Sequence, residues 1–127
     1  MSKIRLFIVD DELDSRELLA YFLLEKKELE IIGYYADGSE LANEIKKHKP
    51  DVVFTDISMP SMSGVEAAKQ LQKVFPGLRF VFVTAHSHFR EIAKTVNNSE
   101  FLLKPVDPEE LDICVENIKA EYAKSGD

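Results

Sequence analysis

Short apolar blocks alternate along the chain with segments in which apolar residues recur every three or four positions. Each block has the length of a strand, and each periodic segment has the spacing of one buried helix face. The blocks predict strands at residues 4–9, 31–35, 52–55, 79–84 and 101–103. The periodic segments predict helices around residues 18–23, 41–45, 65–75, 89–96 and 111–122, and residues 58–64 are interpreted as a loop.

Five strand–helix units predict a five-stranded parallel sheet, because parallel strands need a crossover helix between them. The near-continuous apolar run at residues 4–9 is typical of a central strand that is covered on both faces. The flavodoxin-like strand order 2-1-3-4-5 suits five units, and it makes the first and third strands neighbours where the order reverses. The predicted fold class is therefore α/β and doubly wound, with helices on both faces.

Length and composition describe a single domain, expected to span residues 1–123, with residues 124–127 as a tail or the start of a linker. The formal charge of −7 argues against sequence-independent binding of nucleic acid, which needs a basic face. The single cysteine, Cys114, excludes an internal disulfide and a cysteine-based zinc site. No apolar stretch approaches the length of about 18 residues that a membrane span needs. A cytoplasmic protein without membrane contact is expected.

Polar side chains stand at the ends of four predicted strands. Asp10 and Asp11 follow the first strand, Asp56 follows the third, Thr84 ends the fourth and Lys104 follows the fifth. In an open parallel sheet these ends border the crevice where ligands bind. Three converging carboxylates repel one another and favour a bound cation, and oxygen ligands alone select a hard ion, Mg²⁺ before Ca²⁺ or Zn²⁺. The sequence therefore predicts a pocket for Mg²⁺ and a phosphoryl group.

Each polar residue has an expected part in that pocket. Asp11 and Asp56 are expected to bind the metal directly and Asp10 largely through water, while a loop carbonyl near Ser58 could add an oxygen. Taken alone, the acids at residues 10–12 would be read as a helix N-terminus favoured by the macrodipole. The presence of Asp56 and Lys104 favours the metal site instead.

Asp56 is the best placed carboxylate to act as nucleophile toward a phosphoryl donor, which would give an acyl phosphate. Phosphoryl transfer needs mainly positioning and neutralised charge, and the compact ammonium of Lys104 supplies part of that charge. The hydroxyl of Thr84 can hydrogen-bond a phosphoryl oxygen. Phe101 is either a core aromatic or a ring that turns inward when Thr84 is drawn to a phosphate, and both can hold in different states. The isomer of the bond before Pro105 is left open.

Several of these residues lie in short motifs with the spacing of a known family. Asp10-Asp11, the stretch Asp56-Ile57-Ser58-Met59-Pro60 with Gly64, Thr84-Ala85 and Lys104-Pro105 together resemble the receiver domain of two-component response regulators, which has a CheY-like fold. The resemblance spans essentially the whole chain.

That resemblance implies that Asp56 accepts a phosphoryl group from a sensor histidine kinase and that Mg²⁺ is required. It implies no enzyme activity beyond the domain's own phosphorylation and dephosphorylation. It also implies that Thr84 and Phe101 relay the change to the face formed by the fourth helix, fifth strand and fifth helix. Such receivers commonly form homodimers through that face.

A narrower resemblance covers residues 84–107, which are similar to receivers of the LytTR (LytR/AlgR) type. Receivers joined to AraC-type domains share the stretch around Asp56 and the ending Lys104-Pro105-Val106. Either resemblance implies transcription regulation through a C-terminal DNA-binding domain that this chain does not contain. The alternative is a stand-alone receiver that acts by protein–protein interaction in a phosphorelay.

Other classes lack the residues that they need. A phosphatase or mutase with an aspartate nucleophile usually has a second acid two residues later, where this chain has Ser58. A flavin-binding electron carrier of the same fold would need a hydroxyl- and glycine-rich loop after the first strand, in place of the acids at residues 10–12. No GxxxxGK or GxGxxG sequence occurs, so the sequence gives no sign of a nucleotide site.

Overall fold

The computed structural model describes residues 3–59 and 62–124. Pro60 of the motif quoted above and residues 125–127 of the predicted tail lie outside the described residues. The elements in chain order are β1 (Ile4–Val9), α1 (Leu13–Leu24), β2 (Leu29–Tyr35), α2 (Leu41–His48), β3 (Val52–Thr55), β4 (Ser58–Met59), β5 (Met62–Ser63), α3 (Gly64–Val74), β6 (Arg79–Thr84), the 3₁₀ turn η1 (Ser87–Phe89), α4 (Arg90–Ala93), β7 (Ser99–Leu103) and α5 (Pro108–Lys124). Among the described residues, no helix is both long and apolar enough to cross a bilayer.

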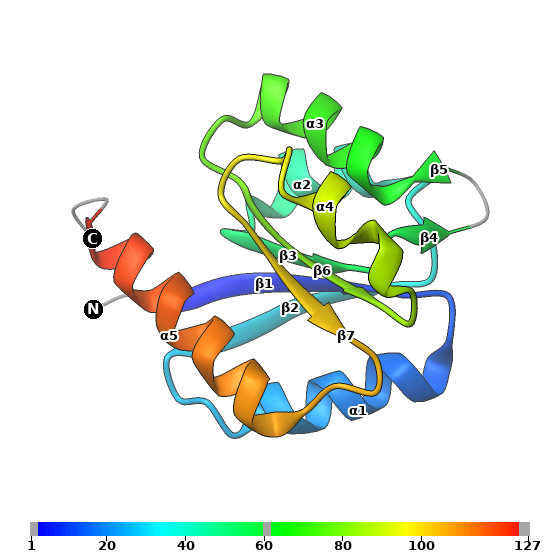
Figure 1. Cartoon of the computed structure of the whole chain (residues 1–127). Coiled ribbons are helices and arrows are strands. Elements are labelled where there is room, and N and C mark those ends of the chain that lie inside the picture. The colour runs from blue at the N-terminus through cyan, green and yellow to red at the C-terminus, as the bar shows by residue number, and fades with distance from the viewer. Residues whose placement is uncertain (1–2, 60–61, 125–127) are drawn as a thin grey trace.

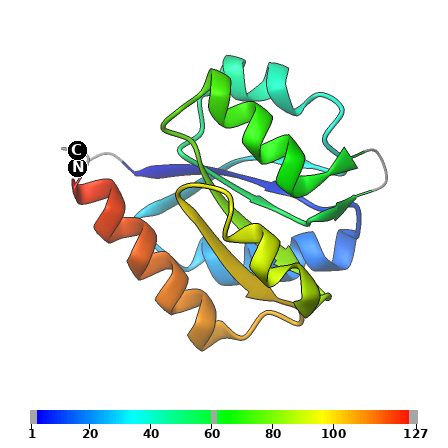
Figure 2. The same ribbon diagram turned by 45° about the horizontal axis from the view of Figure 1, so that its top comes forward.

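Five strands form one parallel sheet in the order β2-β1-β3-β6-β7 (Figure 1). This confirms the predicted order 2-1-3-4-5, with β2 and β7 at the two edges. Helices α1 and α5 cover one face of the sheet, and α2, α3 and α4 cover the other, as the turned view also shows (Figure 2). The three-layered α/β architecture predicted from the sequence is therefore confirmed.

Two apolar cores lie on opposite faces of the sheet, and the alternation of β1 supplies both. Leu6 and Ile8 pack in the core beneath α1 and α5, whereas Phe7 and Val9 pack in the core beneath α2, α3 and α4. All four side chains are almost completely buried. The uninterrupted apolar run of β1 thus reflects a strand that is covered on both sides.

Edge strand β2 contains Gly33, and the strand continues through it. The pairing with β1 shifts register between Leu6 and Phe7, so that Leu6 lies beside Ile31 while Phe7 lies beside Gly33. A Cβ atom at Gly33 would lie 2.7 Å from ring atoms of Tyr35. The glycine therefore leaves room for the tyrosine ring, which stacks edge-on against Phe7.

The segment at residues 58–64 was predicted to be a loop, and this prediction is wrong in part. Ser58–Met59 pairs antiparallel with Met62–Ser63, and Gly64 is already the first residue of α3. The Gly64 N–H donates a hydrogen bond of 2.8 Å to the Ile57 carbonyl. Two-residue strands carry no alternation that a sequence pattern could show, which explains why the hairpin was missed.

The fourth helix is much shorter than the apolar repeat at residues 89–96 predicts. The α4 helix has four residues, follows the 3₁₀ turn η1, and continues in turns whose bonds span three residues, from Thr95 N to Ile92 O and from Val96 N to Ala93 O. Thr95 and Val96 are β-branched and disfavour a regular helix. Asn98, at φ 54°, then turns the chain into β7.

Candidate functional site

Two buried carboxylates meet at the carboxyl ends of the central strands. Strands β1 and β3 pair so that Val9 lies beside Thr55, which places the following residues, Asp10 and Asp56, next to each other. The Asp56 N–H extends this pairing with a hydrogen bond of 3.1 Å to the Val9 carbonyl. Asp10 is 5% exposed and Asp56 is 6% exposed. The sheet thus holds two acids in a place that is costly for negative charge.

Lys104 provides the compensating charge. Its Nζ atom lies 2.7 Å from Asp10 Oδ2 and 2.9 Å from Asp56 Oδ2, and its side chain is 12% exposed. The backbone fixes this position, because the N–H of Lys104, just after β7, donates a hydrogen bond of 2.7 Å to the carbonyl of Thr84, the last residue of β6. The bond from Lys104 to Pro105 is cis. The two distances from Nζ show that the Lys104 ammonium bridges both carboxylates.

The electrostatics of the site keep Lys104 charged. Burial alone would lower the pKa of Lys104, but the hydrogen bonds and charges of Asp10 and Asp56 outweigh it and raise that pKa. Burial raises the pKa of Asp10, and hydrogen bonds from Lys104 and from the Glu12 N–H offset only part of this effect. The pKa of Lys104 and the pKa of Asp10 are thus both raised, the first by the neighbouring carboxylates and the second by burial.

An excess of carboxylates surrounds the single ammonium. Asp10, Asp11, Glu12 and Asp56 each offer an oxygen, and these oxygens all lie within 4.8 Å of one another. Asp11 and Glu12 are exposed, so the cluster opens to solvent on their side. Four oxygen donors of negative charge fit a hard divalent cation such as Mg²⁺. The predicted convergence of Asp10, Asp11 and Asp56 is what the structure shows.

Glu12 and Arg16 also lie at the site, although neither was among the residues predicted to bind the metal or the phosphoryl group. Glu12 Oε1 lies 3.3 Å from Lys104 Nζ, and the Glu12 N–H donates to Asp10 Oδ1 at 2.9 Å. Arg16 donates from Nη1 to the Asp10 carbonyl at 2.6 Å. A side chain in the first turn of a helix leans back toward the N-terminus, and this rule could have pointed to Arg16.

Gly64 packs directly against the backbone of the site. A Cβ atom there would lie 2.9 Å from the Asp56 carbonyl oxygen and 2.9 Å from the Ile57 Cα atom. Both are main-chain atoms that cannot rotate away. The absence of a side chain at Gly64 is therefore what allows α3 to begin so close to Asp56. The backbone of Ser58, whose carbonyl was predicted as a ligand, belongs to β4.

Thr84 and Phe101 lie on adjacent strands but have different surroundings. Thr84 is fully buried, and its Oγ1 accepts a hydrogen bond of 3.3 Å from the His86 N–H in the loop after β6. Phe101 is half-buried on the α4 side of β7, and the Arg90 guanidinium carbon lies 4.6 Å from the centre of its ring. Thr84 thus lies at the carboxyl end of β6, whereas Phe101 lies on the face of the sheet that α4 covers.

The sequence of the chain matches the family described as response regulator receiver domain over residues 6–116. This chain is a response regulator receiver domain. A receiver domain is a phosphoacceptor module and not an enzyme that acts on a separate substrate. The acids that converge here, Asp10, Asp11, Glu12 and Asp56, form the acidic pocket that is typical of receivers.

Several relatives are similar over nearly the whole chain. An uncharacterized response regulatory protein of Vibrio cholerae is 40% identical over 93% of this receiver and 49% of its own length. The transcriptional regulatory protein BtsR of Escherichia coli is 36% identical, with 95% and 50% covered, and the sensory transduction protein LytT of Bacillus anthracis is 36% identical, with 85% and 44% covered. These relatives confirm the resemblance to the LytTR type. The chain spans about half the length of the relatives it matches.

Solved structures confirm the fold. A two-component response regulator of the LuxR family from Aurantimonas superposes with a TM-score of 0.84 at 27% identity, over 94% of this chain and 87% of that one. The isolated receiver domain of RcsB from Salmonella enterica, determined with the phosphomimetic BeF₃⁻, gives a TM-score of 0.86 at 20% identity, over 94% and 90% of the two chains. The CheY-like fold class is therefore confirmed.

Proposed function

We propose that Asp56 accepts a phosphoryl group from a sensor histidine kinase and that the modified receiver then switches an output. The observation that supports this most is the position of Asp56 at the end of central strand β3, with its Oδ2 atom 2.9 Å from Lys104 Nζ. A carboxylate oxygen of Asp56 attacks phosphorus, the bond from phosphorus to the donor breaks, and an acyl phosphate remains on the side chain. Lys104 neutralises part of the charge on the transferred group.

Asp10, Asp11, Asp56 and the backbone carbonyl of Ser58 are the proposed ligands of Mg²⁺. When bound, Mg²⁺ supplies further positive charge to the phosphoryl oxygens. Asp10 is already bonded to Lys104 and to the Glu12 N–H, which supports a contact with the metal through water. Asp11 is exposed and is therefore the more accessible direct ligand.

The output that we propose is regulation of transcription through a C-terminal DNA-binding domain outside this chain. In support, the E. coli relative is described as a transcriptional regulatory protein, and the matched relatives are about twice as long. In this proposal residues 1–123 form the receiver and residues 124–127 a tail or linker start. The regulator formed by the receiver and its output domain is proposed to act in the cytoplasm without contact with a membrane. A stand-alone receiver in a phosphorelay is the second candidate.

Thr84 and Phe101 are proposed to carry the change from Asp56 to the face formed by α4, β7 and α5. A local charge event needs an element with two states to be read elsewhere. Thr84 lies at the end of β6, and Phe101 lies half-buried on the neighbouring strand. In the proposal the hydroxyl closes on the phosphate, the ring moves inward, and two receivers associate through the altered face. Sedimentation with and without beryllofluoride would show this as a change from monomer to dimer.

Intact-mass measurement tests the proposed acceptor. Incubation with acetyl phosphate and Mg²⁺ should add one phosphate that hydroxylamine removes. Asp56→Asn should take up none, whereas Asp37→Asn, which changes an exposed acid in the loop after β2, should behave as the wild type. Equal uptake by Asp56→Asn and the wild type would overturn the assignment.

A further inference from the structure

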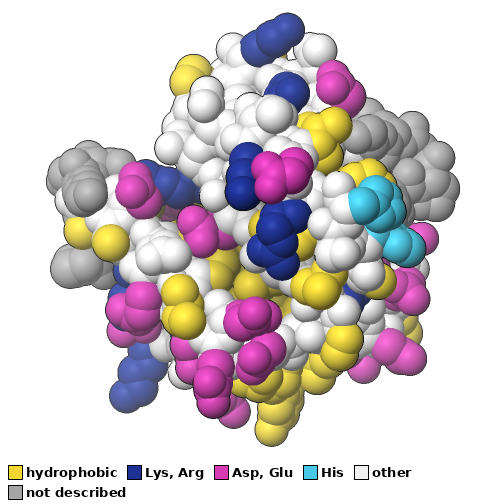
Figure 3. Space-filling model, viewed as in Figure 1, with side chains coloured by type: hydrophobic (Ala, Val, Ile, Leu, Met, Phe, Trp, Pro, Cys, Tyr) yellow, Lys and Arg dark blue, Asp and Glu magenta, His cyan; other side chains and the backbone are white. Residues whose placement is uncertain are grey.

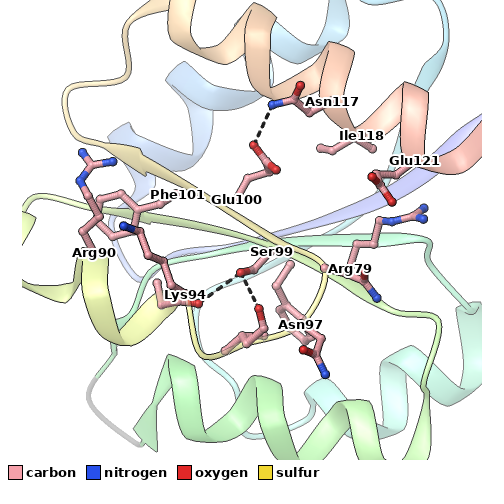
Figure 4. Close-up of a pocket in the computed structure, with 14 residues that line it drawn as sticks. Arg79, Arg90, Lys94, Asn97, Ser99, Glu100, Phe101, Asn117, Ile118 and Glu121 are labelled. Carbon is pink, nitrogen blue, oxygen red and sulfur yellow. Dashed lines mark hydrogen bonds between the residues drawn. The ribbon is translucent and has the colours of Figure 1, made fainter.

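A groove runs in front of edge strand β7, between α4 and α5 (Figure 4). Its cavity has a volume of about 630 Å³. One wall carries Arg90 of α4 and Lys94, which directly follows that helix, and the other carries Asn117 and Glu121 of α5. In the space-filling view, Lys and Arg side chains gather over α4 and acidic side chains gather over α5 below it (Figure 3). Phe101 of β7 lines the groove beside Arg90, next to the wall that carries the positive charges.

Arg90 covers the outer side of the Phe101 ring. Its guanidinium carbon lies 4.6 Å from the ring centre, within the range in which a cation is attracted to an aromatic face. Arg90 is exposed, and the close-up shows it beside Phe101 at the end of the groove (Figure 4). The ring is thus held between the core beneath α4 and a charged group in solvent.

The neighbours of Phe101 on β7 are fixed by other contacts. The Ser99 hydroxyl donates to the Val96 carbonyl at 2.8 Å, Glu100 accepts a hydrogen bond of 3.2 Å from Asn117, and Leu102 is buried beneath α5. Phe101, in contrast, is covered on its outer side by a side chain from α4. The α4 helix is a single turn between 3₁₀-like turns, and Arg90 is its first residue. Arg90 therefore joins the ring to the least regular helix of the described chain.

We propose that Arg90 is a positioning residue that holds the Phe101 ring at the groove and so opposes the inward movement of the ring. This inference rests on the proposed function, in which phosphorylation of Asp56 draws the ring inward. The Phe101 ring can move inward only when the Arg90 side chain releases it. More phosphoryl group, or more of its mimic, is therefore needed to change the state of the domain. Arg90 thus sets the threshold of the switch without touching the acidic pocket.

The contact predicts a measurable but modest threshold. An exposed cation–aromatic contact corresponds to roughly a two- to five-fold change in an equilibrium. Arg90→Ala should therefore lower, by that factor, the concentration of beryllofluoride at which half of the protein changes state in the presence of Mg²⁺. The amide resonances of α4, followed by NMR, give the midpoint.

Lys94→Ala is the matched control, because Lys94 lies one helical turn from Arg90 in the same wall of the groove and pairs with Glu91. It removes the same charge and should leave the midpoint unchanged. In a Phe101→Leu background, Arg90→Ala should have no effect, since the ring is absent. An equal midpoint in the wild type and Arg90→Ala, or an effect that persists in Phe101→Leu, would overturn the role of Arg90.

A second readout needs no phosphoryl mimic. The Phe101 ring should shift the side-chain proton resonances of Arg90 upfield in the wild type, and Phe101→Leu should return them to ordinary positions. Unshifted resonances in the wild type would overturn the contact itself. A wild type with the ring shift but no response to beryllofluoride would overturn the proposed function, and the threshold role with it. A response that is identical in Arg90→Ala would overturn the threshold role alone.

Discussion

The ammonium of Lys104 lies 2.9 Å from the carboxylate of Asp56, and it is shared with Asp10 at 2.7 Å. The three residues come from the ends of three strands, so the parallel sheet itself brings them together. Together with Asp11 and Glu12 these acids give the site more negative than positive charge. This charge distribution fits the Mg²⁺ and the phosphoryl group that we propose as ligands.

Removing the ammonium should destabilise the domain. In Lys104→Ala the buried carboxylates of Asp10 and Asp56 lose their partner, and we expect the free energy of unfolding to fall by about 3 kcal/mol. Urea unfolding at neutral pH measures this. Lys26→Ala, which breaks the more exposed ion pair with Asp112, should cost less than about 1 kcal/mol. Similar losses in the two variants would contradict the buried bridge.

Metal binding should depend more on Asp11 than on Asp10. Asp11 is exposed in the acidic cluster, whereas Asp10 is bonded to Lys104. Asp11→Asn removes the proposed direct ligand, so calorimetric titration should show a larger loss of Mg²⁺ affinity for Asp11→Asn than for Asp10→Asn. Binding to the wild type should itself be weak without phosphate. Equal loss in both variants, or none in either, would count against this ligand scheme.

A methyl group at Gly64 should disturb the backbone that carries Asp56. In Gly64→Ala the new Cβ atom meets the Asp56 carbonyl oxygen and the Ile57 Cα atom at 2.9 Å, so α3 or the end of β3 must move. We expect a loss of about 1–3 kcal/mol in the free energy of unfolding and slower phosphorylation by acetyl phosphate. Gly77→Ala meets nothing within 4 Å and should change neither. A fully stable and active Gly64→Ala would show that this close approach is unimportant.

Cys114 should make stability depend on alkaline pH. Burial, and to a lesser extent the charge of Glu100, raises the pKa of the Cys114 thiol to about 12. In the unfolded chain the thiol ionises at about pH 8.5. The stability gained by burying the neutral thiol is therefore complete below that pH and is lost progressively toward about pH 12. Urea unfolding at pH 8 and pH 10 should show a larger decrease for the wild type than for Cys114→Ala. Equal decreases would argue against a buried thiol.

Much of the fold followed from the sequence because its signals are local and repeated. The apolar block of β1 and the helical repeats fixed the number and type of the main elements, and the rules for parallel sheets fixed their order. The convergence of Asp10, Asp56 and Lys104 followed from that order, since strand ends at one edge of a sheet are neighbours. Their separations and burial could not be read from spacing.

The features that were missed depend on tertiary contacts. The apolar repeat at residues 89–96 is the same for a full helix and for a single turn between 3₁₀-like turns, and only the structure distinguishes them. The contact of Arg90 with Phe101 depends on how the side chains of α4 and β7 pack against each other, which the sequence pattern does not show. The approach of Glu12 to Lys104 likewise joins side chains 92 positions apart.

The most direct test of the central claim is to locate the modified residue chemically. Protein treated with acetyl phosphate and Mg²⁺ is reduced with borohydride, which converts an aspartyl phosphate to homoserine, and the product is digested and sequenced by mass spectrometry. Homoserine at position 56, absent without acetyl phosphate and absent at positions 10 and 11, is the predicted result. Homoserine at position 10 or 11, or unmodified Asp56 in protein that has gained a phosphate, would contradict the account.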